Sequence, residues 1–207
     1  MSLADALKER TNDMHRHAET RPLQKALVGG KATRNQLATY LAQLGHLHQT
    51  IEDLIDALPE PARAIASHSS LHSRSVARDL QTLEITPEVL PETAHLADEL
   101  RYHCAQQPFF IIGALYVLEG SMNGNKYIAR GLAGSLGLAP GHPGLSYWDP
   151  YGDNQRSKWI GFRTALDTIT RTQTEEQAVH DGAAYMFKAV AEISDAAADA
   201  ADAVSAV

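Results

Sequence analysis

The sequence predicts an all-α protein folded as a single-domain, multi-helical bundle. Apolar residues recur at helical spacing along almost the whole chain, and strict alternation of apolar and polar residues over five or more positions is hard to find. The 207 residues are 44% hydrophobic and 21% charged, as in ordinary globular proteins. With no internal repeat and no long linker, we expect one helical domain over residues 1–194.

The first helix is expected to begin at Ser2. Its hydroxyl can cap the helix, and Asp5 lies in the first turn, where the helix dipole favours a negative charge. Pro22 ends this helix or begins the next one. The apolar face of the helix consists of Leu3, Leu7, Met14 and Ala18.

A short helical segment and a long helix come next. The short segment stops at the glycine pair Gly29–Gly30. Thr33 and Gln36 have the spacing of a capping box and begin the long helix. The apolar positions of the long helix are Leu37, Leu41, Leu44, Ile51, Ile55 and Leu58.

Prolines divide the middle of the chain. Pro59 and Pro61 close the long helix, and a further helix covers residues 76–83. Pro91 precedes another helix, and Pro108 opens the most apolar one. That helix contains many glycines, each of which costs about 1 kcal/mol relative to alanine, so the glycines need a packing or functional reason.

The last third of the chain begins with a loop over residues 140–154, which is rich in glycine, proline and aromatic residues. Trp159–Ile169 follows as a helix, and Thr174 with Gln177 caps a final one. The Ala/Asp-rich tail 195–207 is of low complexity, and we expect it to fray.

Charge and cysteine content exclude several classes of protein. The formal charge is −7, from 18 basic and 25 acidic residues, which disfavours a nucleic-acid partner. The single cysteine, Cys104, cannot form an internal disulfide, and residues 1–10 do not have the layout of a signal peptide. Phe109–Leu118 is the most apolar stretch and is too short to cross a bilayer. We expect a cytoplasmic protein with no membrane span.

Ten histidines raise the question of a metal site. His15 and His17, like His46 and His48, are two residues apart and point roughly 200° away from each other on a helix. Neither pair is therefore a helical chelate. A di-iron carboxylate bundle would need two Glu-x-x-His motifs, and the chain has one, Glu92–His95.

Three polar residues of the first helix lie along one edge. Lys8 precedes His15 by seven residues, and Glu19 follows it by four. Lys8 and His15 are then about 10 Å apart along the helix axis, which suits a flat ligand such as haem, with a nitrogen ligand at its centre and a cation at its rim. Glu19 can accept a hydrogen bond from the second imidazole nitrogen. The polar margin of an ordinary amphipathic helix is the alternative explanation.

A second informative stretch contains Gly120 and Gly124, which lie on the same face of a helix. Two missing side chains let another object approach the backbone, either a packed helix or a planar ligand. Ser121, Asn123 and Asn125 offer hydrogen bonds beside them.

These stretches resemble the haem oxygenase family. Leu7–Glu19 (LKERTNDMHRHAE) is similar to the family's opening helix. Gly113–Gly124 (GALYVLEGSMNG) looks like the distal helix of its bacterial members, especially those associated with bacterial phytochromes. Asp149–Gly152, followed by Trp159 and Phe162, is similar to their later loop and helix. The resemblance covers most of the chain.

The resemblance implies a role for each matching residue. His15 would be the proximal ligand of the haem iron, with Glu19 as its hydrogen-bond partner and Lys8 paired with a propionate. Gly120 and Gly124 would be the distal glycines that let a kinked backbone lie close to the haem. The haem would then lie between the first helix and the glycine-rich helix.

The activity implied by the resemblance is the oxidative opening of haem, which serves as both substrate and cofactor. O2 and electrons from an external donor, a ferredoxin or a flavoprotein reductase, would yield biliverdin, carbon monoxide and iron. Ser121 stands where animal members have an aspartate that organises distal water, and Asn125 replaces a second glycine. Further propionate contacts are expected from among Arg130, Arg163 and Lys188.

Three alternatives stay open. A haem-binding or haem-trafficking protein of the same fold would use His15 without turnover. A thiaminase-like hydrolase would need Cys104 as nucleophile, although a small buried apolar role is the commoner one for a lone cysteine. A di-iron bundle is disfavoured by its single motif. The sequence does not reveal the oligomeric state.

Overall fold

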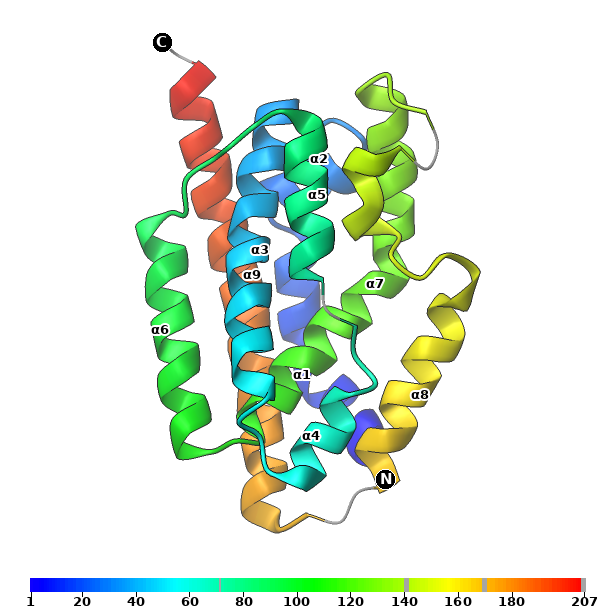
Figure 1. Ribbon diagram of the computed structural model, residues 1–207, viewed down its shortest axis with the longest axis vertical. Helices are drawn as coiled ribbons and strands as arrows, with labels where there is room; N and C mark the ends of the chain where they lie inside the picture. The colour runs from blue at the N-terminus through cyan, green and yellow to red at the C-terminus, as the bar shows by residue number, and fades with distance from the viewer. Residues whose placement is uncertain (71, 140–141, 169–170, 206–207) are drawn as a thin grey trace.

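The computed structural model describes residues 1–70, 72–139, 142–168 and 171–205, and every regular element within these ranges is a helix (Figure 1). The predicted all-α class and single domain are therefore confirmed. The α-helices are α1 (Leu3–Glu19), α2 (Pro22–Val28), α3 (Arg34–Ile55), α4 (Glu60–Ala66), α5 (Ser73–Leu83), α6 (Pro91–Gln106), α7 (Phe110–Ser135), α8 (Gln155–Thr168) and α9 (Gln173–Ser205). Two 3-10 helices, η1 (Pro143–Trp148) and η2 (Gly152–Asn154), lie between α7 and α8.

Local capping chemistry sets the helix starts. The predicted caps at Ser2 and Thr33 are confirmed, because each hydroxyl accepts a hydrogen bond from the backbone N–H three residues later, at 3.2 and 3.1 Å. The predicted cap at Thr174 is wrong. α9 is capped by Thr172, whose hydroxyl accepts from Glu175 N at 3.2 Å while the Glu175 carboxylate accepts from Thr172 N at 2.6 Å. A carboxylate at this position also favours the positive end of the helix.

The sequence predicts only a helix end at Pro59 and Pro61, yet α4 begins there. Pro59 is its N-cap and Pro61 lies in its first turn, where the backbone N–H groups need no helical partner. Ala62 and Ile65 of this helix are fully buried. Their burial in the core stabilises a helix that is too short to form alone.

The buried face of α1 differs from the predicted one at Met14, which is 41% exposed. Thr11 is buried instead, and its hydroxyl donates to Leu7 O at 2.7 Å. α1 packs against α9, and its buried residues include Leu7, Thr11 and Ala18. Met14 is not among them.

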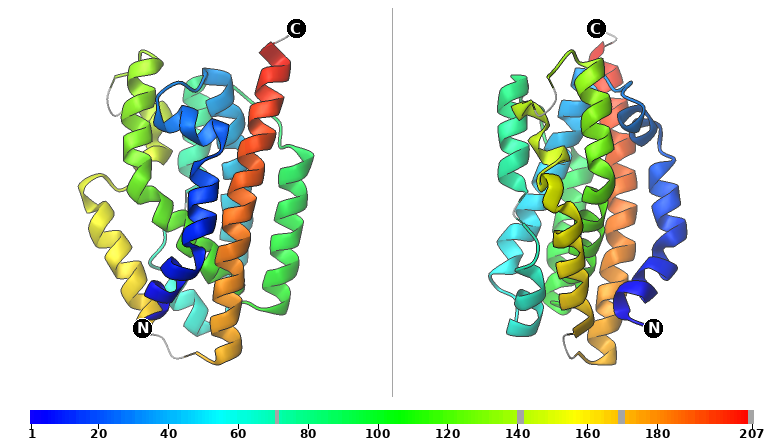
Figure 2. Two further views of the ribbon diagram at one scale, coloured as in Figure 1. Left: turned by 180° about the vertical axis from the view of Figure 1, so that it is seen from behind. Right: turned by 90° about the vertical axis from the view of Figure 1, so that its right-hand side faces the viewer.

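The helices form a bundle with α7 and α9 in its middle. In the edge-on view (Figure 2, right), α1 lies on one outer face, α4 and α5 lie on the other, and α7 and α9 run between them. α6 and α8 flank the bundle at opposite sides (Figure 1). α1 and α7, far apart in sequence, are thereby placed around one region of the interior.

Two glycines allow α7 and α9 to cross at backbone contact. A Cβ added to Gly113 would lie 2.0 Å from Val179 O, and one added to Gly182 would lie 1.9 Å from Phe110 O. Both positions therefore require the absence of a side chain. Within the stretch Gly113–Gly124, Gly113 therefore serves the packing of α7 against α9.

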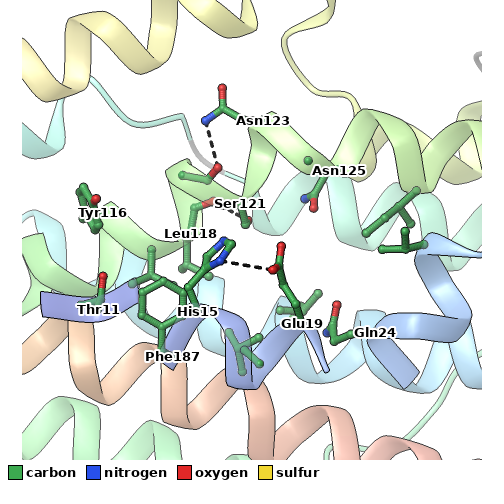
Figure 3. Close-up of a pocket in the computed structure, with 18 of the residues that line it drawn as sticks. Thr11, His15, Glu19, Gln24, Tyr116, Leu118, Ser121, Asn123, Asn125 and Phe187 are labelled. Atoms are coloured by element: carbon green, nitrogen blue, oxygen red, sulfur yellow. Dashed lines mark hydrogen bonds and ion pairs between the residues drawn. The ribbon is translucent and has the colours of Figure 1, made fainter. Parts of the chain in front are cut away.

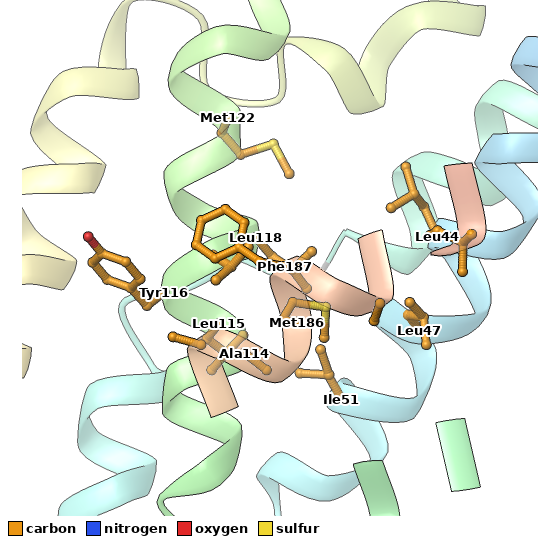
Figure 4. Close-up of a cluster of buried hydrophobic side chains, with 14 of the residues drawn as sticks. Leu44, Leu47, Ile51, Ala114, Leu115, Tyr116, Leu118, Met122, Met186 and Phe187 are labelled. Atoms are coloured by element: carbon orange, nitrogen blue, oxygen red, sulfur yellow. The ribbon is translucent and has the colours of Figure 1, made fainter. Parts of the chain in front are cut away.

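The core between α3, α7 and α9 is apolar. Side chains from these helices interdigitate in the cluster drawn in Figure 4, which includes Leu47 and Ile51 from α3, Leu115 from α7 and Met186 from α9. Each of these four side chains is at most 4% exposed. Phe187 extends from the same cluster toward the site described below.

In the part of the tail that the structure describes, α9 continues through Ser205. Ala197 and Ala201 are buried, so the alanines of the low-complexity sequence face the bundle. Arg21 Nε donates to Asp195 Oδ1 at 2.9 Å, which ties the tail to the start of α2. The predicted helix limits at Pro140 and Ile169 lie outside the described residues.

Candidate functional site

A cavity of about 900 Å³ lies between α1 and α7. Its volume is within the range of small-molecule and cofactor sites, roughly 300–1,000 Å³. α1 and α2 form one wall, α7 forms the opposite wall, and α8, α9 and η1 contribute side chains around them. The six predicted site residues all line this cavity: Lys8, His15, Glu19, Gly120, Ser121 and Gly124.

His15 projects from α1 into the cavity (Figure 3). Its Nδ1 lies 3.4 Å from Glu19 Oε2, slightly longer than a normal hydrogen bond, and the His15 side chain is 52% exposed. Phe187 of α9 meets the imidazole edge-on, with ring centroids 5.6 Å apart. Glu19 and Phe187 orient the imidazole, and Nε2 is left for a ligand in the cavity.

The glycines of α7 shape the opposite wall in two ways. A Cβ added to Gly124 would meet no atom within 4 Å, so this glycine opens directly onto the cavity. A Cβ added to Gly120 would lie 3.3 Å from Trp159 Cη2, so this glycine also accommodates a side chain of α8. Gly124 is the position at which a planar ligand can approach the α7 backbone most closely.

The polar side chains of this wall donate hydrogen bonds within their own helix. Ser121 Oγ donates to Leu118 O at 2.7 Å, and Asn123 Nδ2 donates to Gly120 O at 2.9 Å (Figure 3). Asn125, which is 7% exposed, donates to the sulfur of Met122. The oxygen of Ser121 retains lone pairs for a water or a ligand in the cavity.

Cationic side chains line the cavity at different places. Lys8 and Arg163 do so as predicted, and Arg163 Nη2 donates to Asp5 Oδ1 at 2.7 Å. Two other predicted anion contacts are not brought to the cavity: Arg130 lies over the ring of Tyr127, and Lys188 pairs with Glu192 at 3.4 Å. Lys25 of α2 also lines the cavity, and no motif in the sequence indicates it.

Tyr147 and Trp148 of η1 also line the cavity, although neither was predicted as a site residue. The buried carboxylate of Asp79 on α5 holds η1 by accepting from Ser146 N at 2.9 Å and from Tyr147 N at 2.8 Å. Burial raises the pKa of Asp79, and these hydrogen bonds oppose that shift. The aromatic residues of the 140–154 loop are the feature of the sequence that indicates this part of the cavity lining.

The structure disfavours the predicted alternatives that need a thiol or a metal cluster. Cys104 is buried on α6 outside the cavity lining, and burial raises the pKa of its thiol to about 12. In the part of the chain that the structure describes, no group of three or more His, Cys, Asp and Glu side chains is arranged to hold a metal ion. No helix within that part has both the length and the apolar character needed to cross a bilayer.

Known proteins place this architecture in context. Residues 1–196 match the family model described as heme oxygenase, and no curated protein matches the sequence. Heme oxygenase-2 from Synechocystis, solved with heme and NO, is 21% identical and superposes with a TM-score of 0.86 over 99% of this chain and 88% of its own. Heme oxygenase from Leptospira interrogans is 20% identical, with a TM-score of 0.81 over 94% of this chain and 98% of its own.

The fold extends beyond these enzymes. A TenA homologue from Pyrococcus furiosus is 11% identical and has a TM-score of 0.68 over 94% of this chain and 99% of its own. At such identities the structural likeness shows the fold alone. The family model, in contrast, matches nearly the whole sequence, so the chain belongs to the heme oxygenase family.

Proposed function

We propose that this protein is a haem oxygenase, which opens haem with O2 and electrons to biliverdin, carbon monoxide and iron. The observation that carries the proposal is that His15 and Gly124 line the same cavity from opposite walls. An imidazole on one side supplies an iron ligand, and a glycine at which an added Cβ would meet no atom within 4 Å leaves room for a planar ring on the other.

The residues present fit haem. His15 Nε2 would bind the iron, and Lys8 and Arg163 would pair with the propionates from the cavity lining. When bound, haem supplies the iron at which O2 is activated and the ring that is opened. The chain supplies the position, the apolar surroundings and the protons.

Each residue then has a defined task. The Glu19 carboxylate favours the proton on Nδ1 of His15, so that Nε2 is free to bind. Phe187 limits rotation of the imidazole. Because Ser121 already donates to Leu118 O, its oxygen can accept a hydrogen bond from a water and hold that proton source beside Gly120 and Gly124. Gly120, Ser121 and Gly124 form the side of the proposed site at which the reaction would take place.

Electrons must come from an external donor, for which we propose a ferredoxin or a flavoprotein reductase in the cytoplasm. The net charge of −7 leaves no overall attraction for an acidic donor, so docking would depend on local cationic groups. Lys25 is such a group at the cavity, since Lys8 is assigned to a propionate.

The test is the visible spectrum of the protein with one equivalent of hemin, followed in air after addition of ascorbate. Haem cleavage predicts a sharp Soret band that decays into the broad red absorption of biliverdin. His15→Ala should lose the normal axial ligand and most of the turnover. His17→Ala is the matched control, because His17 is on the same helix but does not line the cavity.

A second candidate is haem binding without turnover. The internal hydrogen bonds of Ser121, Asn123 and Asn125 favour it, because these groups hold fewer donors for the cavity than an aspartate-organised water cluster would. A stable Soret band that never decays would decide for this candidate. A spectrum no different from that of free hemin would refute both.

A further inference from the structure

A buried polar cluster adjoins the glycine wall of the cavity. Its centre is Glu119, the residue immediately before Gly120, which is only 3% exposed in an apolar run of α7. Its carboxylate accepts hydrogen bonds from His72 Nε2 at 3.1 Å, from Tyr151 OH at 2.8 Å and from the hydroxyl of Ser69. We call these four residues the Glu119 cluster. A buried carboxylate is tolerated only with such partners.

The donors of the Glu119 cluster come from two other segments of the chain. Ser69 and His72 belong to the connection between α4 and α5, and Tyr151 precedes η2 and α8. Ser70 N donates to Tyr151 OH at 3.2 Å, so these two segments are also tied to each other. Glu119 is therefore a point at which both segments are hydrogen-bonded to α7.

The Glu119 cluster lies directly behind residues that line the cavity. None of its four residues lines the cavity, but Gly120 does, and Trp159 of α8 packs against Gly120. Glu119 holds α7 one residue before Gly120, and Tyr151 holds the chain eight residues before Trp159. The Glu119 cluster thus restrains both Gly120 and Trp159, whose contact lies next to the open wall at Gly124.

We propose that Glu119 is a positioning residue: through Tyr151 and His72 it fixes where Gly120–Gly124 and Trp159 lie around the cavity. Its relevance to haem cleavage rests on the proposed function, but the placement itself does not. The carboxylate acts on the glycine wall from behind and does not touch a ligand.

Two variants and a matched control test this role in the haem-free protein. Glu119→Gln replaces an acceptor oxygen by a donor, and Tyr151→Phe removes the hydroxyl that donates to Glu119 and accepts from Ser70 N. Glu52→Gln is the control. Glu52 of α3 accepts a hydrogen bond from Ser73 N at 2.9 Å, at the end of the connection between α4 and α5, and it has no hydrogen bond to α7 in the described structure. Loss of a charge-assisted bond predicts roughly tenfold faster hydrogen exchange at backbone amides 120–125 in both test variants. The control should leave these amides unchanged.

The second measurement is the stretching band of carbon monoxide bound to the hemin-loaded, reduced protein, which reports how closely the glycine wall surrounds the ligand. Both test variants should shift or broaden the band, and Glu52→Gln should not. Unchanged exchange and an unchanged band in Tyr151→Phe would overturn the proposal, as would equal effects in the control. If Glu119→Gln does not fold, Tyr151→Phe decides. Failure of the wild type to bind hemin would refute the proposed function, and the exchange measurement would still decide the role of Glu119.

Discussion

Replacing Gly124 by alanine should stabilise the haem-free protein and weaken its haem site. A Cβ at Gly124 meets no atom within 4 Å, and the residue lies well inside α7. Alanine is favoured over glycine in a helix by about 0.5–1 kcal/mol. For a chain of this length, that gain raises Tm by about 1–4 °C. The same methyl group projects into the cavity, where overpacking against a bound ring costs about 1–3 kcal/mol, or roughly a 5- to 150-fold loss of hemin affinity.

Gly134→Ala is the matched control for this experiment. Gly134 also lies in α7 with no atom within 4 Å of an added Cβ, but it does not line the cavity. Thermal denaturation should show a rise in Tm for both variants, smaller for Gly134→Ala because Gly134 is the second-last residue of α7, and titration of absorbance with hemin should show weaker binding for Gly124→Ala alone. Wild-type hemin affinity in Gly124→Ala, or a fall in its Tm, would refute the assignment of Gly124 to the open wall.

Three further predictions concern the packing and pH response of the bundle. Gly113→Ala forces a Cβ to within 2.0 Å of Val179 O, so we expect a loss of about 3 kcal/mol or more and a Tm lower by about 6–12 °C, measured by thermal denaturation. Burial and the neighbouring His72 lower the pKa of His48 well below 6.5. As the pH falls below about 6.5, the unfolded state therefore binds a proton at His48 before the folded state does. The free energy of unfolding then falls by up to about 1.4 kcal/mol per pH unit. His48→Gln should flatten this slope in denaturant titrations at pH 5, 6 and 7. Deletion of residues 195–207 should cost about 2 kcal/mol, because it removes two buried alanine methyl groups and the partner of Arg21; an unchanged midpoint of urea unfolding would contradict this packing.

Local signals in the sequence were sufficient for most of the fold. Capping at Ser2 and Thr33 depends on residues within one helical turn, and both caps are confirmed. The error at Pro59 has a local cause as well, since proline both ends a helix and fits the first turn of the next. The packing of the tail depends on tertiary contacts that composition does not encode, because Asp195 pairs with Arg21 and the alanines Ala197 and Ala201 are buried.

The residues of the site also fall into those that local spacing predicts and those that only tertiary packing brings to the cavity. Lys8, His15 and Glu19 share one edge of one helix, so their spacing alone placed them together. Phe187 and Tyr147 reach the cavity from distant segments, and only the packing of α9 and η1 reveals them. Arg163 was one of three equivalent cations in the sequence, and the contact between α1 and α8 singles it out.

The backbone contact between Gly113 and Gly182 makes that crossing a fulcrum for α7. Neither helix can move inward there, so a change in the width of the cavity would require α7 to rotate about this point, against the hydrogen bonds that hold Glu119. Gly124 lies eleven residues further along the helix, a lever arm of about 16 Å at 1.5 Å per residue. A rotation of about 5° then moves Gly124 by about 1.4 Å, enough to separate a wall in van der Waals contact with a flat ligand from one that releases it.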